Sequence, residues 1–179
     1  MLDLKSFRQA GRDIKKIDMG TANEWSKKSV KEKTEYAGNF DVYKLNDTLT
    51  LHLTKMYDGH VDSVDVPSGW TWHTHPRGCA SLDNCSIIPP SATDMKLFAQ
   101  KSDEQHMVMS KTRIYWVRAI NDYSATDCND ILIFYEKLEN NFDNKTYDHD
   151  RFDEIFTLSS KLGHFFFIFK FRNKKIVEI

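Results

Sequence analysis

Two histidines one residue apart, His73 and His75, are the side chains whose spacing points most directly to chemistry. The residues before them, Trp-Thr-Trp at 70–72, are aromatic and β-branched, which predicts a strand. On a strand, residues i and i+2 point to the same side, so both imidazoles are expected to face one point in space. Pro76 lacks an N–H group and is expected to end the strand.

A carboxylate is expected to join the histidine pair from the start of a helix. Ser91 and Asp94 precede residues 95–100, an apolar run with helical spacing, and two prolines precede Ser91. Ser91 then fits the N-cap position and Asp94 the first turn, where the helix dipole favours a carboxylate. Two imidazoles and one carboxylate, with a fourth place left to water, are the pattern of a catalytic zinc site, whereas structural sites fill all four places.

The segment 69–94 resembles the JAMM metalloproteases, also called the MPN-plus family. Their motif is a Glu well upstream, then His-x-His-Pro, then Ser-x-x-Asp, and the matching residues here are His73, His75, Pro76, Ser91 and Asp94. The resemblance implies that the two histidines and Asp94 bind Zn²⁺ and that Ser91 steadies the oxyanion. A histidine pair near an Asp is also common as ordinary surface chemistry, and Ser91 can be an N-cap, an oxyanion donor or both.

The resemblance further implies a general base at the opening of the first strand, commonly in the pattern Glu-x-x-Gly. Glu35 and Gly38 fit that pattern, while Glu24 and Glu32 are the other acids nearby. The second Gly that many family members carry four residues later is replaced by Val42. A Glu beside zinc can take a proton from zinc-activated water and pass it to a leaving amine, so we expect Glu35 to be the acid/base residue.

Length and composition predict one α/β domain, residues 1–179. The chain is 40% hydrophobic and carries a net charge of −1, which gives no electrostatic reason to expect a nucleic-acid partner. No apolar run approaches the length of a membrane span, and the N-terminal residues lack the apolar core of a signal peptide. The three cysteines do not form the disulfide framework of a secreted protein, so we expect an intracellular protein.

The hydrophobic patterns predict the elements around the site. The predicted strands are 36–45, 48–56, 70–75, 106–110, 113–120, 164–172 and 175–179. The predicted helices are a short one within 21–33, then 93–102, 127–141 and 151–162, while 1–17 is a helix or an arm that docks on a partner. The resemblance implies a mixed, curved sheet flanked by helices, similar to cytidine deaminases. Its motif-supported core covers about 30–140, between an N-terminal arm or helix (1–29) and a C-terminal helix–strand extension (141–179).

Three further features of the sequence leave alternatives open. Residues 77–90 form an insertion beside the metal, and its Cys79 and Cys85 are inert thiols, a bridge that stiffens a flap, or ligands of a second metal. His106 is expected to be packed or exposed rather than a ligand. A second Ser-x-x-Asp, 124–127, has no paired histidines upstream and is expected to be only an N-cap motif.

The function that the resemblance implies is a zinc-dependent hydrolase of amide or isopeptide bonds, acting on ubiquitin or ubiquitin-like conjugates. The insertion and the motif spacing are most similar to JAMM-type proteins of large DNA viruses, which makes an infected cell or a virion the expected location. The alternative is a non-catalytic MPN scaffold, such as a virion structural component in a multiprotein assembly. Such scaffolds have usually lost a ligand, and this chain keeps them all. A metal-dependent nuclease would require more carboxylates and a basic groove.

Overall fold

The computed structural model describes residues 3–4, 14–54, 57–60, 64–76, 90–110, 114–142, 166–172 and 175–178. Within these ranges, strands and helices follow one another in a mixed α/β order. The strands are β1 (Lys16–Asp18), β2 (Tyr36–Leu45), β3 (Thr48–Leu53), β4 (Tyr57–Asp58), β5 (Thr71–Thr74), β6 (His106–Met109), β7 (Ile114–Ala119), β8 (Phe166–Arg172) and β9 (Lys175–Glu178). The helices are α2 (Ala22–Glu32), α3 (Ala92–Gln100) and α4 (Ala125–Phe142).

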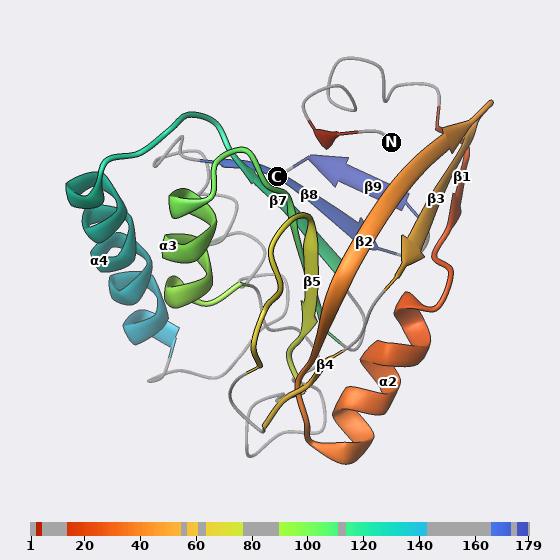
Figure 1. The fold of residues 1–179 in the computed structure, drawn as a ribbon, viewed down its shortest axis with the longest axis horizontal. Coiled ribbons are helices and arrows are strands. Elements are labelled where there is room, and N and C mark those ends of the chain that lie inside the picture. Colours follow the sequence, from red (N-terminus) through yellow and green to blue (C-terminus); the bar gives the residue numbers. More distant parts are fainter. Residues whose placement is uncertain are drawn as a thin grey trace.

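The strands form one curled, mixed sheet in the order β1-β3-β2-β5-β6-β7-β8-β9, and β4 pairs with β2 beside it. β1 runs parallel to β3, β5 runs parallel to β6, and the other pairs are antiparallel. Helices α3 and α4 cover one face of the sheet and α2 lies against the other (Figure 1). The α/β class and the mixed, curved sheet flanked by helices agree with the prediction from the sequence.

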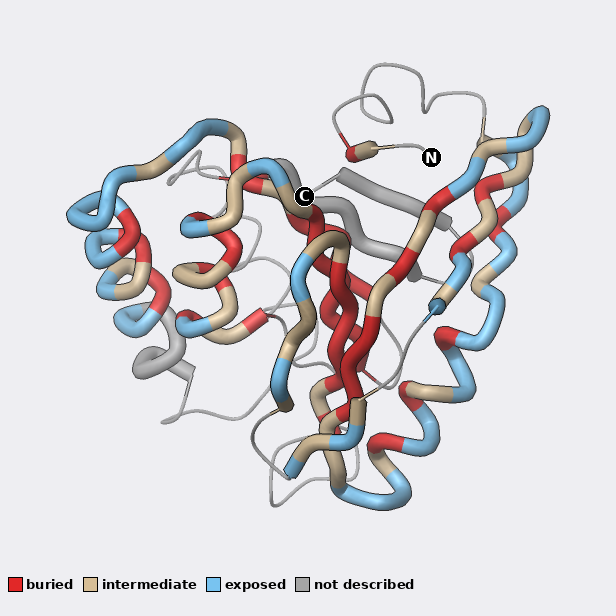
Figure 2. The backbone as a smooth tube through the Cα atoms, viewed as in Figure 1, coloured by how far each residue is buried: buried red, intermediate tan, exposed pale blue. Residues whose placement is uncertain are grey.

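The sheet separates two hydrophobic cores, because alternate residues of each strand point to opposite faces. The α2-side core contains Trp25 of α2 together with Tyr36, Trp72, Met107 and Trp116 from neighbouring strands. Buried backbone runs along the central strands, whereas much of α2 away from the sheet is exposed (Figure 2). This core supports strand β5, which carries the histidine pair, from the α2 side of the sheet.

The α3-side core fills the space between the sheet and helices α3 and α4. It contains Met95 and Phe98 of α3, Ile131 of α4, and Val108 and Tyr115 from the central strands. Each of these side chains is almost completely buried. The core therefore fixes α3 against β5, β6 and β7, and with it the position of the residues at the start of α3.

One predicted element differs at its end, and others lie outside the described residues. Ile17 belongs to strand β1 and pairs with Leu49, whereas its spacing from the preceding apolar residues predicted a helix or a docking arm over 1–17. A short apolar run fits the period of a helix as well as that of a strand, and pairing with β3 makes Ile17 a strand residue. Most of residues 1–13, the cysteines Cys79 and Cys85, and the predicted helix 151–162 lie outside the described residues. None of the described helices is long and apolar enough to cross a membrane.

Candidate metal centre

The histidine pair is positioned by strand β5 in the middle of the sheet. β5 pairs with β2 on one side and β6 on the other, and the register places His73 beside Ala37 and Val108. His75 continues the path of the strand, because its N–H donates to the Met109 carbonyl oxygen at 2.9 Å. His73 therefore points toward the α3-side core, and His75, two residues further on, lies on the same face.

The third donor comes from the first turn of α3, which begins at a complete capping box. The Asp94 N–H donates to Ser91 Oγ at 3.1 Å, while Asp94 Oδ2 accepts from the Ser91 N–H at 2.7 Å and the Ser91 hydroxyl at 2.8 Å. These bonds satisfy N–H groups that the start of a helix leaves without intrahelical partners. They also hold the Asp94 carboxylate in one orientation, so the residue that closes the cap also supplies a possible ligand.

Donor atoms of three residues meet between β5 and α3. His73 Nε2 lies 3.1 Å from His75 Nε2 and 3.3 Å from Asp94 Oδ1, and His75 Nε2 lies 3.3 Å from Asp94 Oδ2. The ligand atoms of the three residues all lie within 4.8 Å of one another, so the group could hold a metal ion. Imidazole nitrogen and carboxylate oxygen are both common ligands of divalent transition metals.

The spacing of these donors fits direct ion pairs and also leaves room for a shared cation. Charge-assisted N–H···O bonds are usually about 2.7–2.9 Å long, whereas both histidines stand 3.3 Å from Asp94. The two Nε2 atoms also face each other at 3.1 Å, and two N–H groups cannot both donate across that gap. A cation placed among the donors would satisfy all three residues at once.

The electrostatics of the site keep Asp94 ionised. Its side chain is 17% exposed, and those of His73 and His75 are 5% and 10% exposed, so water screens their mutual interactions weakly. Burial alone raises the pKa of Asp94, but charge and hydrogen bonds from His73, and then from His75, hold that pKa well below its usual value. Metal ligands must be deprotonated to bind, and this carboxylate is in the required form.

Glu35 lies immediately before β2, the strand that pairs with β5. Extending the antiparallel register, in which Ala37 pairs with His73, by two residues places Glu35 opposite His75. Residues opposite each other in such a pair present their side chains to the same face, so the extended register predicts that Glu35 shares the face of the imidazoles. Its backbone is fixed there by a bond from the Glu35 N–H to the His60 carbonyl oxygen at 2.8 Å. Glu35 is half-buried and is not part of the donor group.

The other acids near Glu35 in the sequence lie elsewhere. Glu24 and Glu32 are exposed residues of α2, the helix that packs on the opposite face of the sheet. Glu32 accepts a hydrogen bond from the Tyr36 hydroxyl. Burial, with this bond next in importance, raises the pKa of Tyr36 to about 12, so the phenol stays protonated. Of the three acids, Glu35 is therefore the one that the extended register assigns to the face of the donors.

The second Ser-x-x-Asp repeats the capping box without the histidines. At the start of α4, Asp127 Oδ2 accepts from the Ser124 hydroxyl at 2.7 Å and the Ser124 N–H at 3.1 Å, and the Asp127 N–H donates to Ser124 Oγ at 3.1 Å. Hydrogen bonds from the Ser124 side chain and then its backbone lower the pKa of Asp127. The prediction of an N-cap motif is confirmed, and the chain contains a matched pair of caps.

His106 is packed, as predicted, but its contacts were not. It is buried on β6, bonded to Thr71 of β5 and stacked on Phe98 of α3. No local spacing in the sequence could have linked these residues, because the bond joins parallel strands 35 residues apart.

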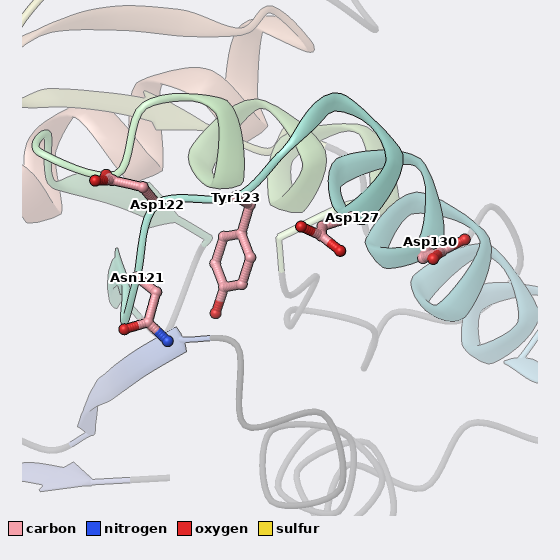
Figure 3. Close-up of a pocket in the computed structure, with 5 residues that line it drawn as sticks. All are labelled: Asn121, Asp122, Tyr123, Asp127 and Asp130. Atoms are coloured by element: carbon pink, nitrogen blue, oxygen red, sulfur yellow. The ribbon is translucent and has the colours of Figure 1, made fainter.

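A surface hollow elsewhere on the chain is separate from the donors. It lies where the loop after β7 meets the start of α4, and it is lined by Asn121, Asp122, Tyr123, Asp127 and Asp130 (Figure 3). Its carboxylates are not accompanied by histidine, and the donor group that the described residues contain is the one between β5 and α3. The hollow therefore adds nothing to the metal centre.

Comparison with known proteins adds no assignment to this geometry. No known protein-family model matches the chain, and no curated protein matches it. The interpretation of the site therefore depends on the donors themselves and on the short motif resemblance in 69–94.

Proposed function

We propose that this chain is a zinc-dependent hydrolase of amide or isopeptide bonds, of the JAMM type. The observation that carries the proposal is the convergence of His73, His75 and Asp94 from a strand end and a helix start. The curled, mixed sheet with helices on both faces is consistent with a JAMM/MPN-like fold. The three ligands that the described residues offer leave one tetrahedral place for water, which is the arrangement of catalytic rather than structural zinc sites.

The donor spacing supports zinc in particular. Tetrahedral zinc with nitrogen and oxygen ligands at about 2.0–2.1 Å requires donor atoms about 3.3–3.4 Å apart. The two Nε2 atoms lie 3.1 Å apart, and each lies 3.3 Å from a different oxygen of Asp94, so these separations are close to that value and the carboxylate must turn to present one oxygen to the ion. Two imidazoles also favour zinc over the hard cations Mg²⁺ and Ca²⁺, which prefer oxygen ligands.

When bound, zinc supplies Lewis-acid chemistry, since it lowers the pKa of water toward neutrality and polarises a carbonyl group. The chain itself supplies the residue that moves protons. Glu35 shares the face of the imidazoles without belonging to the donor group, which suits a base that takes a proton and returns it to the leaving amine. We assign Glu35 this acid/base role.

Ser91 has two roles in this proposal, and both use its single hydroxyl hydrogen. A serine hydroxyl has a single O–H donor, and here it points to Asp94 Oδ2 at 2.8 Å. In this state Ser91 orients the metal ligand. To donate to a developing oxyanion, the hydroxyl must turn away from Asp94, whose Oδ2 still accepts from the Ser91 N–H at 2.7 Å.

The substrate class follows from the resemblance alone. JAMM proteases often cleave ubiquitin or ubiquitin-like conjugates, and we propose the same class here, in an infected cell or a virion. A panel of ubiquitin dimers with defined linkages, incubated with zinc-loaded protein, tests this directly. Cleavage of at least one linkage that stops on chelation is the expected result.

A pair of glutamate variants tests the mechanism. Glu35→Gln is expected to keep zinc and to lower the cleavage rate by about 10²–10⁴, the usual contribution of a general acid/base. Glu32→Gln is the matched control, because Glu32 lies on the far face, and it is expected to cleave normally. Full activity in Glu35→Gln would show that Glu35 is not the acid/base residue. Bound zinc with no cleavage of any dimer by the unaltered protein would favour the scaffold.

A further inference from the structure

A second layer of buried side chains lies directly beneath the metal donors. Thr71 precedes His73 by two residues on β5, and Phe98 follows Asp94 by four residues on α3. Both spacings put the two members of each pair on one side of their element. Strand β5 and helix α3 therefore each contribute one metal donor, His73 or Asp94, and one buried side chain beneath it, Thr71 or Phe98.

His106 of strand β6 joins the two side chains of this lower layer. It pairs with Thr71 in the parallel register, and its Nδ1 lies 2.9 Å from Thr71 Oγ1. Its ring stacks on Phe98, with centroids 4.1 Å apart and planes 9° from parallel. The Phe98 ring also lies near His73, at a centroid distance of 6.5 Å. One imidazole thus contacts the element that carries the histidine donors and the element that carries the carboxylate.

Packing alone does not account for a histidine at this position. His106 is fully buried, and its Nε2 has no hydrogen-bond partner among the described residues, which costs stability. Burial first, and then the positive charge of Lys101, lower the pKa of His106 to about 3, so the ring is neutral. A phenylalanine would stack on Phe98 equally well with no unpartnered nitrogen. What the imidazole adds is the bond to Thr71.

We propose that His106 is a positioning residue, which sets the spacing of β5 and α3 so that His73 and Asp94 meet around one metal ion. This inference depends on the proposed metal centre. The Thr71 bond fixes His106 to β5, and the stack fixes it to Phe98 one helical turn from Asp94. Residues behind metal ligands commonly change metal affinity by about 10–100-fold when they are replaced. Since His106 acts through neighbours, we expect the low end of that range.

The test is a Co²⁺ titration of the metal-free protein, because cobalt reports both affinity and ligand geometry through its visible spectrum. His106→Phe keeps the stack and loses the Thr71 bond, so we expect about tenfold weaker binding and an altered spectrum. His106→Asn can restore a bond to Thr71, and we expect it to recover part of the affinity. Thr71→Val removes the same bond from the other side and should match His106→Phe.

A double variant and a packing control separate positioning from general destabilisation. Thr71→Val combined with His106→Phe should bind no more weakly than either single variant, because both remove one shared bond. Ile131→Val disturbs the same α3-side core from α4 and is expected to leave Co²⁺ affinity and spectrum unchanged. Because two variants remove the bond independently, the test remains decisive when one of them does not fold.

The outcomes distinguish this inference from the metal centre itself. Native affinity and spectrum in folded His106→Phe or Thr71→Val would overturn the positioning role while leaving the centre intact. Equal weakening in Ile131→Val would also overturn it, because destabilisation alone would then explain the loss. If the unaltered protein binds no Co²⁺, the metal centre is wrong and the positioning role falls with it.

Discussion

Substituting Asp94 with Asn, with Asp127→Asn as its internal control, separates metal binding from helix capping. The two carboxylates accept nearly the same bonds: the Ser hydroxyl to Oδ2 distance is 2.8 Å at Asp94 and 2.7 Å at Asp127. Weakening either cap is expected to cost about 1 kcal/mol of helix stabilisation. Only Asp94 also stands 3.3 Å from two imidazole nitrogens, so only its variant should respond differently to metal.

The magnitude follows from linkage between binding and folding. A ligand at about 100 times its Kd that binds only the folded state adds about 2.7 kcal/mol to the free energy of unfolding. For a chain of 179 residues, that corresponds to a rise in Tm of about 5–11 °C. We expect this rise on adding Zn²⁺ to the unaltered protein and to Asp127→Asn, and no rise in Asp94→Asn.

Thermal melts followed by circular dichroism, with Zn²⁺ or with a chelator, measure these shifts. The reasoning is refuted if Asp94→Asn gains as much from zinc as the unaltered protein, since the carboxylate would then be a cap and not a ligand. It is equally refuted if Asp127→Asn loses the zinc effect, since capping strength would then explain the result.

Two further predictions concern the scaffold around the site. Gly20 has a φ of +51°, and a Cβ there would lie 2.5 Å from the Leu51 carbonyl oxygen. Gly20→Ala should therefore cost about 2 kcal/mol of folding stability and lower Tm by about 4–8 °C, with zinc affinity unchanged. A native Tm in this variant would contradict the strain. Burial lowers the pKa of His106 from 6.5 to about 3, so between these pH values the unfolded chain binds more protons and folded stability rises with pH. From pH 5 to pH 7, the free energy of unfolding of metal-free protein should therefore rise about 2 kcal/mol more than that of His106→Phe; equal pH dependence in urea melts would contradict this.

The two halves of the donor group were predictable because their rules are local. His73 and His75 share a face through strand alternation, and the Ser91–Asp94 box follows from helix-capping chemistry within four residues. The sequence therefore indicates both halves of the donor group. Their meeting depends on α3 packing against the sheet, and for that step the prediction relied on a motif resemblance rather than on derivation.

The parts that could not be predicted depend on pairing between distant segments. The pairing of Ala37 with His73 depends on the register of β2 against β5, which the intervening residues do not encode locally. The bond between Thr71 and His106 similarly arises from parallel pairing of β5 and β6. At the edge, Ile17 has apolar spacing that fits a helix, and only its pairing with β3 makes it a strand residue. Short apolar runs carry too little periodicity to decide such cases.

The measurement that tests the central claim most directly is the zinc content of purified protein after reconstitution and dialysis. We expect about one zinc ion per chain in the unaltered protein, and loss of that ion in His75→Ala while the circular dichroism spectrum stays native. Folded, unaltered protein that retains no zinc, or His75→Ala that retains as much as the parent, would contradict the metal centre and every function built on it.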